Sequence, residues 1–134
     1  MKKLLLTLIL AVVSSSAMAE WVEVGWAEDG NATFYADPAT IRKSSNKVKM
    51  WNMLDYKIAT VFKLSYQSYI YVRSLRRQTE YDCKEEKQRI LYVDLLSGNM
   101  GSGETVFTAH KEDDWIPIPH GTANLIFWKF ACGK

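Results

Sequence analysis

Apolar and polar residues alternate along most of this chain, with the period of two that is typical of a strand with one buried face. The turn residues Asp29-Gly30-Asn31 separate the first two alternating segments and predict a hairpin. The segments expected to form antiparallel strands are residues 21–26, 32–36, 47–57, 69–83, 89–96 and 104–109. The pattern therefore predicts about six short strands.

Breaks in the alternation predict where the strands end. Asp37-Pro38 is expected to end the second strand, because proline fixes its own φ and biases the preceding residue towards extended geometry. Residues 38–43 then fit one helical turn capped by Asp37. Residues 58–66 lack a clean period and are interpreted as a loop with a short helical piece.

Glycine and proline mark two further irregular segments. Gly98, Gly101 and Gly103 are expected to form the loosest part of the chain, as a flexible connection between two strands. Pro117 and Pro119 are expected to interrupt any regular ladder around residues 115–116.

The period changes to that of a helix after Gly121. Apolar residues recur there at three- and four-residue spacing, with Thr122 as the predicted N-cap and Gly133 after the last turn. The apolar positions are Ala123, Phe127, Phe130 and Ala131. The expected fold class is α+β, with about six antiparallel strands in a twisted sheet and one C-terminal helix packed on it.

The first nineteen residues have the organisation of a secretory signal peptide. Lys2 and Lys3 precede an apolar run from Leu4 to Val13, and Ala17-Met18-Ala19 is the small-x-small pattern that signal peptidase cuts. The apolar run is too short to cross a bilayer. We therefore expect cleavage after Ala19 and an exported protein, periplasmic or secreted, that is not a lipoprotein because no cysteine follows the cut.

Charge and length narrow the class of protein. The formal net charge of +2 is supplied by Lys2 and Lys3 alone, so residues 20–134 are formally neutral. A neutral chain without a basic cluster is a poor nucleic-acid binder. Residues 20–134 have the length of one domain with one core.

Cys83 and Cys132 are the only cysteines, and an oxidising compartment makes their pairing the default expectation. A metal site or a redox pair is the alternative. Neither has support from spacing, because there is no CxxC motif and His110 and His120 are not at ligand spacing from either cysteine. We predict a structural disulfide that ties the C-terminal helix to the end of the long strand.

No catalytic residue, metal ligand or cofactor is predicted. His110 and His120 have no nucleophile motif beside them. The acidic residues 112–114 do not follow the pattern of a calcium loop. Residues 97–103 resemble a phosphate-binding loop but lack its Lys-Ser/Thr ending and a following helix.

Tyrosine and arginine gather in the long strand, and this mixture is enriched at protein interfaces. We interpret them as a protein-binding surface, with a plain solvated strand face as the alternative. The candidate residues are Tyr69, Tyr71, Arg73, Arg76 and Arg77. Adjacent residues of a strand face opposite ways, so Arg76 and Arg77 cannot join the same surface.

Two further hypotheses follow from the aromatic residues. Tyrosine ligates ferric haem in some proteins, so Tyr66, Tyr69 and Tyr71 suggest a periplasmic carrier of a planar ligand such as haem as the alternative function. Residues 48–54 are apolar on both faces of the predicted strand, which is consistent with a homodimer.

Several motifs in order along the chain resemble the surface-adhesin protein E family of Gram-negative bacteria. They are Phe34-Tyr35-Ala36-Asp37-Pro38 with Ile41-Arg42, Leu54-Asp55-Tyr56-Lys57, Glu80-Tyr81-Asp82-Cys83-Lys84, residues 97–103 and Phe130-Ala131-Cys132. The resemblance implies a mainly antiparallel sheet joined to a helix by a disulfide. It also implies a non-enzymatic, adhesin-like protein that contacts other proteins, as the family's namesake contacts host matrix and serum proteins.

Overall fold

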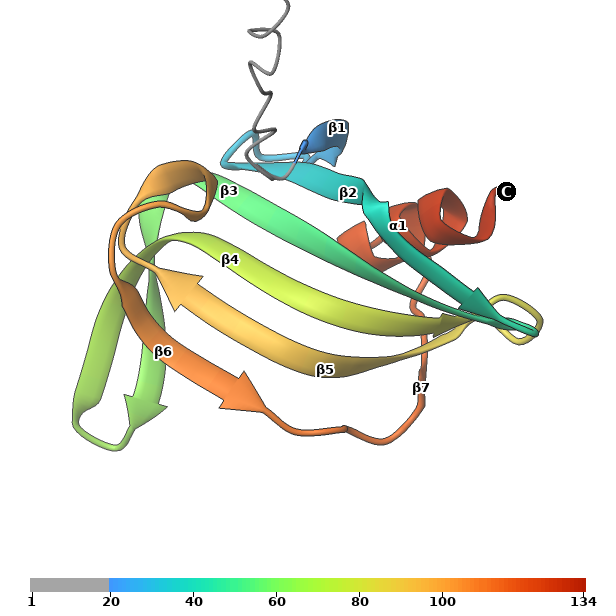
Figure 1. Ribbon diagram of the computed structural model, residues 1–134. Helices are drawn as coiled ribbons and strands as arrows, with labels where there is room; N and C mark the ends of the chain where they lie inside the picture. The colour runs from blue at the N-terminus through green and yellow to red at the C-terminus, as the bar shows by residue number, and fades with distance from the viewer. Residues whose placement is uncertain (1–19) are drawn as a thin grey trace, which may run out of the picture.

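The structure is a computed structural model that describes residues 20–134, so the predicted signal peptide lies outside the described residues. It contains one antiparallel sheet and one α-helix (Figure 1). The strands are β1 (Val22–Trp26), β2 (Ala32–Ser44), β3 (Lys47–Ser65), β4 (Ser68–Asp82), β5 (Lys87–Leu96), β6 (Thr105–His110) and β7 (Ile116–Pro117). A 3-10 turn η2 (Asn99–Gly101) and the helix α1 (Ala123–Cys132) complete the fold. This confirms the predicted fold class.

The sheet is a meander in which each strand pairs with the next in the sequence, in the order β1 to β6. The predicted hairpin of the first two strands is confirmed. β7 is only two residues long, includes Pro117, and pairs with Lys87 and Gln88 at the start of β5. The prolines therefore keep this ladder short, as expected.

The second strand does not end at Asp37-Pro38, and the predicted helical turn is wrong. β2 continues to Ser44, with a bulge between the pairs Asp37–Trp51 and Arg42–Lys49. The Thr40 hydroxyl accepts a hydrogen bond of 2.9 Å from the Trp51 amide, which replaces the missing backbone partner. Proline is tolerated there because a bulged residue does not need its amide proton.

Residues 58–66 are not a loop, because β3 runs through them as far as Ser65. A bulge between the pairs Asp55–Ser74 and Thr60–Val72 shifts the alternation, which hides the strand period in the sequence. Beyond this bulge β3 and β4 pair only with each other and form a projecting hairpin, residues 58–73, which we call the arm. The arm and α1 lie at opposite ends of the curved sheet (Figure 1).

The glycine-rich segment connects β5 and β6, as predicted, but it is held by hydrogen bonds and not loose. Asp55 Oδ1 accepts a hydrogen bond of 2.6 Å from the Met100 amide. The Ser74 hydroxyl donates to the Gly98 carbonyl at 2.7 Å and accepts from the Gly101 amide at 2.9 Å. The segment is therefore packed on the sheet face opposite the helix.

This packing explains the two-sided apolar character of residues 48–54 within one chain. Val48 and Met50 are buried in the cluster beneath α1. Met53 points to the other face and is fully buried there, with its Sδ close to Gly101. A homodimer is thus not needed to cover the second face.

The helix α1 is buried along the side that faces the sheet. Phe127 is fully buried and its ring centroid lies 5.9 Å from that of Phe34. Gly133 ends the helix in the left-handed conformation, as predicted. Thr122 occupies the N-cap position, but its hydroxyl donates to the Pro119 carbonyl, so the expected side-chain cap is absent.

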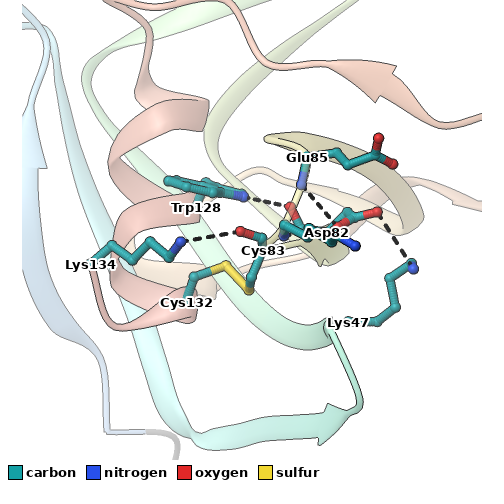
Figure 2. Close-up of a disulfide and its surroundings, with 8 residues drawn as sticks. Lys47, Asp82, Cys83, Glu85, Trp128, Cys132 and Lys134 are labelled. Atoms are coloured by element: carbon teal, nitrogen blue, oxygen red, sulfur yellow. Dashed lines mark hydrogen bonds and ion pairs between the residues drawn. A yellow bond between two sulfur atoms is a disulfide. The ribbon is translucent and has the colours of Figure 1, made fainter.

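The predicted disulfide is confirmed. Cys83 and Cys132 are bonded, with their Cα atoms 5.6 Å apart (Figure 2). Beside the bond, Trp128 Nε1 donates to the Asp82 carbonyl at 2.9 Å and Lys134 Nζ donates to the Cys83 carbonyl at 3.3 Å. The last turn of α1 is thereby fixed to the end of β4.

Candidate protein-binding surface

The predicted binding residues all lie on the long strand β4, where successive side chains point to opposite faces of the sheet. Its odd-numbered residues lie on the face that carries α1, because Arg77 contacts Asn124 and Phe127 of the helix. Tyr69, Tyr71 and Arg73 therefore share this face with Arg77. They lie beyond the part of the face that α1 covers.

The arm adds two residues of β3 to this row. Val61 lies directly opposite Tyr71, and Lys63 lies directly opposite Tyr69. Tyr71 and Tyr69 are 70% and 58% exposed, and Val61 is 50% exposed. We call the exposed residues of this face the arm patch: Val61, Lys63, Tyr69, Tyr71 and Arg73. Side chains that face each other across two strands form one continuous surface.

The chemistry of the arm patch is that of a protein interface. Tyrosines offer large, stiff apolar rings with a polar hydroxyl, and arginine adds a charge and several hydrogen-bond donors. Both residue types are enriched among the side chains that contribute most to protein–protein affinity. Tyr66 at the arm tip is 87% exposed, with Lys63 Nζ 5.3 Å from its ring centroid.

The backbone of the arm is also available for contacts. β3 pairs with β2 only as far as Tyr56, and β4 pairs with β5 only from Ser74 onwards. Ile58 at the base of the arm bonds through its amide and its carbonyl to the Asn31 side chain. Beyond Ile58, the outer edges of both arm strands have no strand partner among the described residues. Open strand edges are templates for pairing with an extended segment of another chain.

Arg77 is placed in a buried polar network and not in the arm patch. Its Nε donates to Asn52 Oδ1 at 2.8 Å and its Nη2 donates to Asn124 Oδ1 at 2.7 Å. Asn52 Nδ2 in turn donates to the Tyr81 hydroxyl at 2.9 Å. Burial lowers the pKa of Arg77 and raises the pKa of Tyr81 to about 12.

Arg76 lies on the opposite face, as the alternation predicts. Its Nε and Nη2 donate to Asp94 Oδ2 at 3.3 and 3.0 Å. Its guanidinium lies 5.8 Å from the ring centroid of Trp51. Of the five candidate residues, only Tyr69, Tyr71 and Arg73 are thus brought together at the surface.

Val61 and Lys63 are the members of the arm patch that the strand period does not reveal. They fall in the segment interpreted as a loop, where the bulge after Asp55 disturbs the period. From Thr60 to Leu64, apolar residues occupy both faces of the strand, so no alternation reveals which face is exposed. Only the register with Tyr71 and Tyr69 identifies them.

The two histidines occupy separate surface positions. The ring of His110 stacks on Tyr92, with centroids 4.0 Å apart and an interplanar angle of 8°. His120 Nε2 lies 3.0 Å from Glu86 Oε2. Within residues 20–134 there is no group of three or more His, Cys, Asp or Glu side chains able to hold a metal ion.

The acidic segment 112–114 is exposed, and Glu112 Oε1 forms an ion pair of 3.1 Å with Arg89. Arg89 also pairs with Glu80 at 2.8 Å and lies 4.6 Å from the ring centroid of Trp115. The acidic residues therefore belong in part to a surface ion-pair cluster. In the part of the chain that the structure describes, no helix is long and apolar enough to cross a membrane.

Fold and surface together define a class of small meander-sheet proteins in which a disulfide anchors a C-terminal helix and one exposed hairpin carries tyrosines and basic residues. The chain belongs to the Surface-adhesin protein E family, whose sequence profile matches residues 21–133. It is thereby an adhesin-like member of a family of surface proteins. No curated protein matches the sequence at a significant level.

Solved structures of Haemophilus influenzae protein E have a similar fold. Crystal form II superposes with a TM-score of 0.58 at 14% sequence identity and covers 83% of this chain and 87% of that chain. Protein E from non-typeable Haemophilus influenzae superposes with a TM-score of 0.55 at 13% identity and covers 89% of this chain and 79% of that chain. At these identities the likeness concerns the fold.

Proposed function

We propose that this protein is a non-enzymatic, adhesin-like binding module that attaches to a protein partner through the arm patch. The observation that carries the proposal is the exposure of Tyr69 and Tyr71 on a hairpin that projects beyond the rest of the sheet. Apolar side chains that form one exposed patch beside polar residues are typical of protein interaction sites. Membership in the surface-adhesin family supports the same conclusion.

The proposed contact combines side chains with the open strand edge. The two tyrosine rings are the anchors, and exclusion of water around them supplies most of the affinity. Arg73 and Lys63 provide the positive charge that favours an acidic partner surface and speeds association. An extended segment of the partner can pair with the free edge of β3 or β4.

The test is binding of the purified chain, residues 20–134, to immobilised extracellular-matrix and serum proteins by biolayer interferometry. Tyr69→Ala and Tyr71→Ala are each expected to weaken binding by about 30-fold, the effect of losing roughly 2 kcal/mol at a hot spot. Trp26→Ala is the matched control, because Trp26 is an exposed aromatic residue on β1, 68% exposed. Equal loss of binding in the control and the arm variants would contradict the proposal.

Self-association has to be separated from partner binding. Size-exclusion chromatography with light scattering at micromolar concentrations gives the oligomeric state of the wild type and of Tyr71→Ala. Should the wild type be a dimer that Tyr71→Ala dissociates, the arm patch is a homodimer contact, and the proposed partner is then a second copy of this chain.

We also infer that the exported form is cleaved after Ala19 and carries no lipid. The inference rests on Lys2, Lys3, the apolar run and the small residues at 17 and 19. The intact mass of protein recovered from the periplasm and the culture medium tests it. A mass that includes residues 1–19 or a lipid would contradict it.

A further inference from the structure

A cavity of about 250 Å³ opens on the sheet face opposite α1, away from the arm patch. It is lined by Trp21, Asp37, Thr40, Trp51 and Arg76. It lies at the bulge in β2, where Asp37 pairs with Trp51 and the following residues leave the regular ladder. Neither the proposed adhesion nor the core uses this cavity.

Asp37 is the group in the cavity whose charge is not compensated. It is only 5% exposed, although carboxylates are rarely buried without a cation. Its Oδ1 accepts a hydrogen bond of 3.2 Å from the Ala39 amide, and this turn contact uses one of the two oxygens. Within residues 20–134 no Lys, Arg or His forms an ion pair with Asp37.

Arg76 does not supply the missing charge, because Asp94 already neutralises it. Both its Nε and its Nη2 donate to Asp94 Oδ2, and the other oxygen of Asp94 accepts from the Thr108 hydroxyl at 2.7 Å. The cavity thus brings a buried carboxylate without an ion-pair partner together with two indole rings, one of which, that of Trp51, also lies 5.8 Å from the Arg76 guanidinium. A buried carboxylate without a cationic partner is costly, and a bound cation relieves that cost.

We propose that this cavity binds a small organic ammonium ion, with Asp37 as its counter-ion and Trp21 and Trp51 as its walls. Indole is the best aromatic partner for a cation, and alkylated ammonium groups are recognised by aromatic walls in this way. The volume admits about eight waters at roughly 30 Å³ each, and it is below the size of drug-binding pockets. The ligand is therefore a small ammonium compound and not an extended molecule.

The experiment is a titration of residues 20–134 with choline chloride, followed by the indole N–H resonances of the five tryptophans. The Trp21 and Trp51 resonances are expected to shift with saturation, whereas those of Trp26, Trp115 and Trp128 stay in place. A parallel titration uses the neutral isostere of choline, in which a quaternary carbon replaces the nitrogen. Its affinity is expected to be at least about tenfold weaker, because it lacks the charge.

Asp37→Asn is expected to weaken choline binding by about tenfold as well, while Asn Oδ1 still accepts the Ala39 hydrogen bond and keeps the turn. Asp113→Asn, at an exposed acid elsewhere on the surface, is the matched control and leaves the affinity unchanged. The isostere comparison needs no variant, so it remains decisive if Asp37→Asn does not fold.

Two results would overturn the proposal. One is an equal shift with choline and its neutral isostere, which would show an apolar pocket without cation recognition. The other is choline binding that appears only when the N-terminus is acetylated or extended. This would show that the free α-ammonium group of the chain, next to Trp21, itself occupies the cavity.

Discussion

The indole Nε1 of Trp128 donates a hydrogen bond of 2.9 Å to the main-chain carbonyl of Asp82. Asp82 precedes Cys83, and Trp128 lies four residues before Cys132, the other half of the disulfide. Residues four apart lie on the same side of a helix, so the covalent bond and the hydrogen bond fix the same turn of α1 to the same end of β4 (Figure 2). The stability of the helix contact depends on both.

Removal of the disulfide is expected to lower the free energy of unfolding by about 4 kcal/mol. The two cysteines are 49 residues apart, and loop-closure entropy for such a loop predicts this value. Urea unfolding of the Cys83→Ser/Cys132→Ser double variant measures it, with the reduced wild type as a second sample. A loss below about 1 kcal/mol in both samples would show that the noncovalent contacts of Trp128 and Phe127 suffice.

The buried hydroxyl of Tyr81 is expected to make the protein sensitive to alkali. Burial raises the pKa of Tyr81 from 10.0 to about 12, so between these pH values the unfolded state loses its proton and the folded state keeps it. The free energy of unfolding therefore falls as the pH rises through this window, by up to about 3 kcal/mol. Urea midpoints at pH 9, 10 and 11 for the wild type and Tyr81→Phe test this.

Tyr81→Phe removes the titrating hydroxyl, so the free energy of unfolding of this variant is expected to depend less steeply on pH above about 10. Tyr92→Phe is the control, because Tyr92 is a half-buried sheet tyrosine outside the buried network. The same slope in all three proteins would contradict the assignment to Tyr81.

Protonation of the Asp82 carboxylate is expected to lower the free energy of unfolding at acid pH. Burial by itself raises the pKa of Asp82, but hydrogen bonds from the Lys84 and Glu85 amides and the charge of Lys47 outweigh it, so the pKa is lowered. A lowered pKa stabilises the folded state above the ordinary value of 3.8, and the stabilisation is lost as the pH falls through the folded-state pKa. Chemical unfolding between pH 6 and 2 should show a smaller acid loss for Asp82→Asn than for the wild type.

Asp55→Ala is expected to loosen the β5–β6 connection. The substitution removes the acceptor of the Met100 amide and of Asn99 Nδ2, at 2.6 and 3.1 Å. Loss of a charge-assisted hydrogen bond of this kind costs about 1 to 3 kcal/mol. Hydrogen exchange at Met100 and Gly101 should accelerate, whereas Asp113→Ala leaves their rates unchanged. Unchanged exchange in Asp55→Ala would show that Ser74 alone holds the segment.

Local signals were sufficient for the first hairpin, the C-terminal helix and the cysteine pair. The Asp29-Gly30-Asn31 turn and the three- and four-residue spacing after Gly121 depend only on neighbouring residues. The two strand ends that the pattern predicts wrongly both lie at bulges. Asp37-Pro38 predicts the end of a strand, but β2 passes through it at a bulge. Residues 58–66 lack a strand period because the bulge after Asp55 changes which face each residue occupies.

The candidate surface was predictable only in part. The strand period places Tyr69, Tyr71 and Arg73 on the same face as Arg77. Arg77 is nevertheless covered by α1 and the other three are exposed, because the helix packs on only one end of this face. The uncompensated charge of Asp37 had no signal in the sequence, since an aspartate before a proline is an ordinary turn residue.

The amino-acid sequence by itself determined a mainly antiparallel sheet, one C-terminal helix, one cysteine pair and a strand that groups tyrosine and arginine. These properties follow from local periods and residue chemistry. The tertiary structure decided the register across the bulges, the part of the sheet that the helix covers, and hence which residues are exposed in the arm or buried with Arg77. Those outcomes depend on contacts between residues far apart in the chain, such as Asn52 with Tyr81 and Asp55 with Met100, which no local pattern contains.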